Sequence, residues 1–286
     1  MKIVFYLLLF ISFLTASDFK AELFMIDKNG KKLNRIGYPA KTSVLILKNI
    51  QKEPKIIFNK KTYPAIKTKD GYISLISVNY RQKPGDYQVI IKEGEKTKTM
   101  FFRIKKPNYK KEFLKVDPKK VHLSKKDQKR VQKEYKEAIK IYSHFTPKKL
   151  WKGRFIYPIN SKITSTFGNA RVFNKSLKSY HSGVDFRAKV GTKIKASNNA
   201  KVVLAKNRFF AGNSVILDHG LGIYSCYYHL SKFKVKKNQK VKKGQIVGLS
   251  RKSGRVTAPH LHFSMRVNGV QVDPLQAIKT LNSINF

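Results

Sequence analysis

Three short segments of this chain carry residues whose types and spacing could build a metal site with catalytic imidazoles beside it. They are His181-Ser-Gly-Val-Asp185, Tyr228-His229-Leu230 and His260-Leu261-His262. On a β-strand, residues two apart leave the same face, so His260 and His262 could serve one site. The neighbouring segments 213–228 and 261–267 are rich in β-branched and aromatic residues, which favours strands there.

Acidic residues are scarce in the last part of the chain, which makes each of them informative. Residues 151–286 contain no glutamate and only three aspartates, against 25 Lys and Arg. One of the three, Asp185, follows His181 by four residues across a glycine, so both side chains could turn onto one metal ion. With one histidine of the His260/His262 pair they would form a three-ligand zinc site with an open fourth position, as in catalytic zinc sites.

Proton transfer in such a site falls to imidazole. Many zinc proteases use the glutamate of an H-E-x-x-H motif as general base, and this motif is absent here. The candidates are therefore His229 and the remaining histidine of the later pair. Cys226 is predicted to be a buried, inert thiol because it lies inside an apolar strand. It is also a poor candidate nucleophile, because on a strand it would face away from His229. Arg171 and Tyr180 precede the first ligand and could meet a substrate carboxylate, although a merely exposed arginine is an equal alternative.

In their order, these segments resemble the lysostaphin/LytM-type (M23) zinc metallopeptidases. The resemblance runs from residue 164 to residue 274 and includes Gly244-Gln-Ile-Val-Gly248 and Val272-Asp273-Pro274. It implies a β-rich groove, one zinc ion per catalytic domain and the peptide part of peptidoglycan as substrate. By the same resemblance, the zinc ligands are His181, Asp185 and His262, and the catalytic residues are His229 and His260.

The whole chain is strongly basic, with 61 Lys and Arg against 16 Asp and Glu and a net charge of +45. Such a field attracts polyanions, including nucleic acid, anionic lipid and an anionic cell wall, although a merely solvated basic surface would have the same composition. The N-terminus narrows the choice. Residues 1–17 are typical of a signal peptide: Met1-Lys2, an apolar run over 3–14 and Thr15-Ala16-Ser17. We expect a periplasmic protein with no nucleic-acid partner; an uncleaved membrane anchor is the alternative, although the run is short for a membrane span.

The pattern of apolar and turn residues predicts a mainly β protein in three parts. Residues 18–106 are expected to form an N-terminal Ig-like β-sandwich, with strands over 21–27, 43–50, 55–58, 72–78, 87–91 and 99–104. Residues 107–150 are expected to be a helical linker, with a capping box at Ser124-Lys-Lys-Asp127 and a helix of about five turns. Residues 151–286 are expected to be the LytM-type antiparallel β catalytic domain, with a helix over 274–280.

These observations predict a zinc metalloendopeptidase that hydrolyses peptidoglycan in cell-wall remodelling and cell shape. The expected bond is the D-Ala–diaminopimelate cross-link, because residues 18–150 are loosely similar to periplasmic Gram-negative members. A glycyl–glycine bridge and carboxypeptidase action are the alternatives. A non-catalytic LytM-type activator of a cell-wall amidase is a rival, although such proteins have usually lost zinc ligands. A second rival function is that of a protein that only binds polyanions through its positive charge. The N-terminal domain could cover the groove, recruit a cell-wall partner or act as a spacer.

Overall fold

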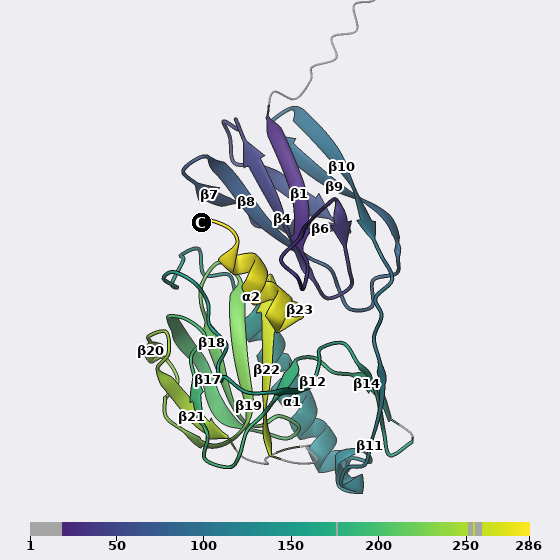
Figure 1. Ribbon diagram of the computed structural model, residues 1–286, viewed down its shortest axis with the longest axis vertical. Helices are drawn as coiled ribbons and strands as arrows, with labels where there is room; N and C mark the ends of the chain where they lie inside the picture. The colour runs from purple at the N-terminus through teal and green to yellow at the C-terminus, as the bar shows by residue number, and fades with distance from the viewer. Residues whose placement is uncertain (1–18, 176, 251–253, 255–258) are drawn as a thin grey trace, which may run out of the picture.

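Two β-rich parts, joined by a segment that contains one long helix, make up the chain (Figure 1). The computed structural model describes residues 19–175, 177–250, 254 and 259–286. Residues 1–17, for which a signal peptide is predicted, lie outside the described residues. Among the described residues, no helix combines the length and the apolar composition needed to cross a membrane.

The first part consists of two five-stranded sheets that share a core. One sheet has the order β2-β1-β4-β8-β7 and the other β3-β10-β9-β5-β6. Each of the six predicted strands is present; the Ig-like assignment itself stays a prediction. The bounds are β1 Lys20–Ile26, β2 Lys32–Asn34, β3 Ile36–Gly37, β4 Thr42–Lys48, β5 Lys55–Phe58, β6 Lys61–Tyr63, β7 Ile66–Thr68, β8 Gly71–Ser77, β9 Gly85–Glu93 and β10 Lys96–Ile104.

Alternation along the strands explains why these sheets pack face to face. In β10, Met100, Phe102 and Ile104 are buried while the residues between them, including Phe101, are exposed. This period of two gives each strand one apolar face. Those faces meet residues such as Leu45 and Leu47 of the opposite sheet in one buried cluster.

The segment between the two parts is only partly the helical linker that the sequence predicts. Its helix α1, Lys125–Ser143, is present at the predicted place, and the Ser124 hydroxyl accepts a hydrogen bond from the Asp127 backbone N–H at 3.1 Å. This bond satisfies one of the free N–H groups at the helix start. A short 3₁₀ helix spans Pro118–Lys120. Before it, however, residues Lys111–Leu114 form a strand, β11, which the sequence reasoning did not predict.

The second part is built mainly on a ten-stranded sheet whose pairings are all antiparallel, as expected. A small sheet, β11-β13-β14, lies beside it. The helix α2, Pro274–Asn282, follows the last strand where a helix was predicted. The strands are β12 Ile163–Ser165, β13 Ala170–Phe173, β14 Leu177–Tyr180, β15 Val184–Arg187, β16 Lys193–Lys195, β17 Ala200–Arg208, β18 Gly212–Asp218, β19 Ile223–Phe233, β20 Lys240–Val241, β21 Ile246–Ser250, β22 His260–Val267 and β23 Val270–Val272.

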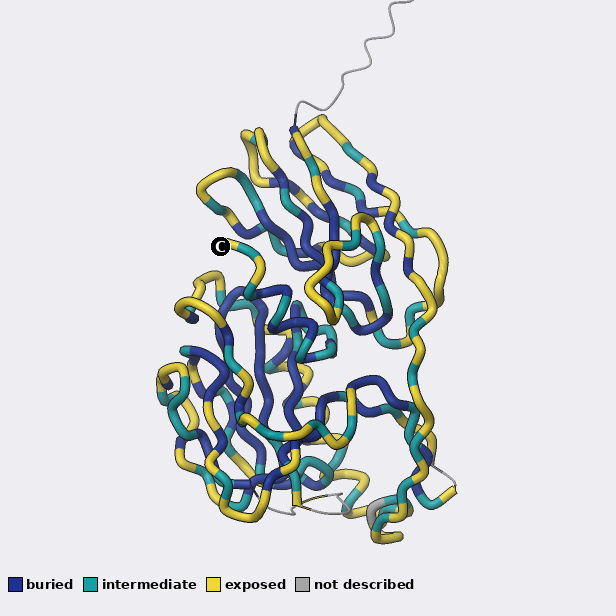
Figure 2. The backbone as a smooth tube through the Cα atoms, in the orientation of Figure 1, coloured by how far each residue is buried: buried dark blue, intermediate teal, exposed yellow. Residues whose placement is uncertain are grey.

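The two parts pack against each other through α2 and the turn between β22 and β23. The Gln276 side-chain amide donates hydrogen bonds to the carbonyls of Ile26 (3.1 Å) and Thr42 (2.8 Å) and accepts one from the Thr42 N–H (3.0 Å). The Asn268 amide donates to the carbonyl of Leu75 at 2.9 Å. Buried backbone, dark in Figure 2, continues from α2 into the first part. The two parts therefore share a core and are not merely tethered.

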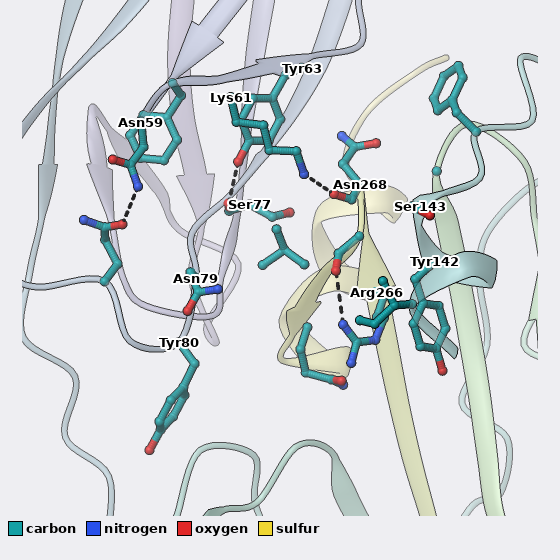
Figure 3. Close-up of a pocket in the computed structure, with 18 of the residues that line it drawn as sticks. Asn59, Lys61, Tyr63, Ser77, Asn79, Tyr80, Tyr142, Ser143, Arg266 and Asn268 are labelled. Carbon is teal, nitrogen blue, oxygen red and sulfur yellow. Dashed lines mark hydrogen bonds between the residues drawn. The ribbon is translucent and has the colours of Figure 1, made fainter. Parts of the chain in front are cut away.

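A cavity of about 940 Å³ lies between the two parts and α1 (Figure 3). At its edge, the Lys61 ammonium donates a hydrogen bond to the carbonyl of Asn268 at 2.5 Å. On the other side, the Arg266 guanidinium lies 4.2 Å from the ring centre of Tyr142 and donates to the carbonyl of Gly269. The residues that line this cavity are therefore held in place by a contact between the two parts and by contacts within the second part and α1.

A buried histidine makes the stability of this fold sensitive to acid. His219 is fully buried, its Nε2 lies 2.7 Å from the Ser225 hydroxyl, and burial lowers its pKa to about 4 from 6.5. The neutral His219 ring contributes fully to the free energy of unfolding above pH 6.5, where it is neutral in both the folded and the unfolded chain. This contribution is lost as the pH falls from 6.5 towards 4, because in that range the unfolded chain takes up a proton on His219 and the folded chain does not. The shift corresponds to about 3 kcal/mol.

We therefore expect the free energy of unfolding, measured by urea titration with chelator present, to fall less between pH 7.5 and 4.5 in His219→Gln than in the wild type. His144→Gln, at an exposed position, is the control and should follow the wild type. An equal fall in all three proteins would show that His219 is not the titrating group.

Candidate metal centre

The register of two neighbouring strands brings Asp185 and His262 together. In the antiparallel pair of β15 and β22, Asp185 lies directly opposite His262. Residues directly opposite in such a pair project from the same face with Cβ atoms about 5 Å apart. Both residues are buried, and Nδ1 of His262 lies 2.8 Å from Oδ1 of Asp185.

The third predicted ligand reaches the same point from the turn before β15. Backbone hydrogen bonds hold His181 against the loop that precedes β13, since its N–H donates to the carbonyl of Asn169 at 2.8 Å. Its Nε2 lies 2.9 Å from Oδ1 of Asp185 and 3.0 Å from Nδ1 of His262. Gly183 makes room for this arrangement: a Cβ there would lie 2.5 Å from Nε2 of His262. The glycine within His-x-Gly-x-Asp is therefore a steric requirement of the site.

These three atoms fit a zinc ion. They lie 2.8–3.0 Å from one another, while tetrahedral ligands 2.0–2.2 Å from zinc lie about 3.3–3.6 Å apart, so an outward movement of less than about 1 Å suffices. Nδ1 of His181 lies 2.7 Å from the carbonyl of Thr166, which fixes the proton on Nδ1 and leaves the Nε2 lone pair for a metal. Two imidazoles and one carboxylate are a donor set that zinc accepts in proteins.

The electrostatics of the cluster favour the protonation states that a metal needs. Burial lowers the pKa of His262 to about 4, so its imidazole is neutral at pH 7. Burial alone would raise the pKa of Asp185, but its short contacts with His181 and His262 hold that pKa well below its usual range. The cluster therefore presents one carboxylate and a neutral imidazole without first losing a proton.

The two predicted catalytic histidines lie beside this cluster. Nε2 of His260 is 3.6 Å from Oδ1 of Asp185, and the ring centres of His229 and His260 are 5.0 Å apart. His229 has a φ of +61°, an uncommon value for a residue other than glycine. Its place in β19 is a bulge, because the register of β19 against β18 shifts there. Bulges redirect a side chain, and this one turns the imidazole of His229 to within 5.9 Å, centre to centre, of the His262 ring.

Cys226 takes no part in the cluster. Its thiol is fully buried and lies 3.3 Å from the Tyr142 hydroxyl, on the side where α1 packs. Burial raises the pKa of this thiol, which keeps it protonated at neutral pH. The prediction of a buried thiol is confirmed, and the pKa agrees with the expectation that it is inert.

Two charged residues near the ligands complete the site, and the sequence reasoning found only one of them. The Arg171 guanidinium donates to Oδ2 of Asp185 and to Oε2 of Glu112, each at 2.9 Å. Glu112 was not predicted, because it lies outside residues 151–286, the segment in which the scarcity of acids was informative. The available signal was the same scarcity argument applied earlier in the chain, since Glu112 is the one acid within Lys110-Lys-Glu-Phe-Leu-Lys115.

The cluster is open to cavities on two sides. One, of about 450 Å³, is lined by His181, His229 and His262 together with residues of α1. The other, of about 560 Å³, is lined by His229 and His260 together with residues of β11 and β13. A substrate could therefore approach the cluster, and His229 borders both routes.

Comparison with known proteins identifies the family. The model of peptidase family M23 matches residues 179–274, a segment that contains all five histidine and aspartate residues of the site. This chain contains an M23 peptidase domain. The identification confirms the resemblance seen in the sequence. It also agrees with the position of the three ligand atoms in the structure.

Two named relatives each match less than half of this chain. The chain is 42% identical over 124 residues to the peptidoglycan DD-endopeptidase ShyA of Vibrio cholerae, which covers 42% of this chain and 29% of ShyA. It is 32% identical over 117 residues to the DD-carboxypeptidase/endopeptidase Mpg of Neisseria meningitidis, which covers 41% of this chain and 27% of Mpg. The chain thus aligns with less than a third of the length of either relative.

A solved structure matches more of the chain than the M23 domain alone. It is a crystal structure from Pseudomonas aeruginosa described as a peptidase M23, 26% identical in sequence, with a TM-score of 0.65. The match covers 85% of this chain and 95% of that one. Elements outside the M23 domain are therefore also shared with that structure.

Proposed function

We propose that this protein is a zinc-dependent peptidoglycan hydrolase that cuts peptide cross-links, acting as a D,D-endopeptidase in the periplasm. The observation that carries the proposal is the convergence of His181 Nε2, Asp185 Oδ1 and His262 Nδ1, with two more imidazoles beside them. This set offers three ligands for one zinc ion and two groups able to move protons.

Each residue then has a distinct task. His181, Asp185 and His262 would hold the zinc ion, which when bound lowers the pKa of water towards neutrality and polarises the scissile carbonyl. Of His229 and His260, one imidazole takes the proton of the attacking water and returns it to the leaving nitrogen. The other donates a hydrogen bond to the carbonyl oxygen as negative charge develops there.

We propose the D-Ala–diaminopimelate cross-link as the substrate bond, because it is a D,D bond and the names of two relatives include DD-endopeptidase action. ShyA is named a peptidoglycan DD-endopeptidase, and Mpg a DD-carboxypeptidase/endopeptidase. We therefore include carboxypeptidase action, the release of a C-terminal residue from the peptide, as a second activity of this site. The net charge of +45 would draw the protein to an anionic cell wall, and this attraction should weaken with salt. Such cleavage would contribute to remodelling of the cell wall and to the determination of cell shape.

Digestion of purified sacculi tests this function. The untreated protein should convert cross-linked muropeptide dimers into monomers, as measured by chromatography and mass spectrometry. Chelation should stop the conversion, and added zinc should restore it, because the three ligands then recover their ion. Unchanged dimers with the zinc-loaded protein would instead favour a non-catalytic activator of an amidase. Conversion that chelator does not affect would contradict a zinc mechanism.

A further inference from the structure

One carboxylate from outside the M23 segment is bound by three side chains, two of which contact the predicted zinc ligands. Oε1 of Glu112 accepts hydrogen bonds from the Ser165 hydroxyl and from the Asn169 amide, each at 2.7 Å. Oε2 accepts one from Nε of Arg171 at 2.9 Å. Although burial opposes it, these three bonds lower the pKa of Glu112, so it is a carboxylate at neutral pH.

Two of these partners lead directly to the metal ligands. Nη2 of Arg171 donates to Oδ2 of Asp185 at 2.9 Å, which leaves Oδ1 turned towards the two histidines. The Ser165 hydroxyl lies 3.0 Å from Nδ1 of His181. Glu112 is thus one side chain away from two of the three ligands.

Strand β11 holds Glu112 firmly in this place. It pairs in parallel with β13, and Glu112 lies directly opposite Arg171 in that pair. The strand is fixed at its end as well, because the Asn174 side chain accepts a hydrogen bond from the Val116 N–H and donates one to the Val116 carbonyl, both at 2.9 Å. Few rotamers are therefore open to the Glu112 side chain, which is 22% exposed.

We propose that Glu112 is a positioning residue of the zinc site, supplied by β11 across Arg171 and Ser165. The inference rests on the proposed zinc site, not on which bond is cut. The Arg171 guanidinium aims Asp185, but its charge would also oppose a bound cation, and Glu112 offsets that charge. Partners of ligating residues commonly change metal affinity by about 10–100-fold.

Replacement of the carboxylate by an amide tests this role with little change of shape. In Glu112→Gln, the Oε1 acceptor can remain for Ser165 and Asn169, but an NH₂ group would face the N–H of Arg171. The guanidinium then loses its anion and its fixed position. We expect zinc affinity, measured by chelator competition, to fall about 10–100-fold. The visible absorption spectrum of the Co²⁺-substituted protein should change as well, because the Asp185 ligand reorients.

Two further variants separate positioning from a general loss of structure. Glu137→Gln removes the α1 carboxylate that pairs with Lys206 on the surface, at 2.7 Å, and should leave zinc affinity and the Co²⁺ spectrum unchanged. Arg171→Lys keeps a positive charge but cannot bridge two carboxylates, so it should reproduce the effect of Glu112→Gln. In the double variant, the two decreases in zinc affinity should not add, since both substitutions break the same contact from Glu112 through Arg171 to Asp185.

These metal measurements decide the role of Glu112 whether or not sacculi are cleaved. Unchanged zinc affinity and an unchanged Co²⁺ spectrum in Glu112→Gln would overturn the proposal. Faster cleavage by this variant with unchanged affinity would also overturn it, because Glu112 would then be a removable occupant of the substrate site. If Glu112→Gln lowers thermal stability in the metal-free state, Arg171→Lys must still weaken zinc binding for the proposal to stand.

Discussion

Asp185→Asn is expected to leave the purified protein without its zinc ion and without measurable hydrolysis of cross-linked muropeptides. Asp185 is the single carboxylate of the ligand set, and its Oδ1 lies within 3 Å of both histidine ligands. A neutral amide is a weaker ligand, and it leaves the Arg171 guanidinium beside the site without its anionic partner. Since zinc lowers the pKa of water from 15.7 to about 7, its loss should reduce kcat/KM by at least about a thousandfold.

Asp218→Asn is the matched control for this change. Asp218 is also buried, and its carboxylate accepts hydrogen bonds from the Thr146 hydroxyl (2.6 Å) and the Gly220 N–H (2.7 Å). This variant should lose stability yet retain one zinc ion per chain, as measured by elemental analysis. Full zinc content in Asp185→Asn would mean that the ion does not depend on this carboxylate.

Removal of the His229 imidazole is expected to abolish most of the activity while the zinc ion stays bound. His229 lies beside the ligands, where its task is proton transfer or oxyanion stabilisation, and such groups contribute about 10²–10⁴-fold to the rate. Asparagine is the better replacement because the φ of +61° suits it more than alanine. We therefore expect kcat of His229→Asn to fall by about this factor with unchanged zinc content.

The exposed His144, changed to asparagine, should have wild-type kcat and zinc content. Two results would contradict the role given to His229. Loss of zinc from His229→Asn would make this residue a ligand, and unchanged kcat would remove it from the chemistry.

Local signals account for the elements that the sequence predicted well. Alternating residues such as Met100, Phe102 and Ile104 mark a strand without any knowledge of its partner. Ser124 marks a helix start because its hydroxyl caps the adjacent N–H groups. The shared site of His260 and His262 was predictable for the same reason, since a spacing of two places both side chains on one face of β22.

Non-local pairing accounts for what the sequence did not reveal. β11 is four residues long and is a strand because it pairs with β13, which lies more than fifty residues further along the chain. The position of Glu112 in the sequence does not indicate that it contacts Arg171. The same holds for the backbone of His229, whose bulge depends on the register between β18 and β19.

The zinc site itself is tested most directly by anomalous diffraction from crystals of the zinc-loaded protein, measured on both sides of the zinc absorption edge. A single strong peak should lie about 2.0–2.2 Å from Nε2 of His181, Oδ1 of Asp185 and Nδ1 of His262, with His229 and His260 outside this distance. A peak bound by His229 or His260, or the absence of a peak among these residues, would contradict the assignment of ligands and of catalytic imidazoles.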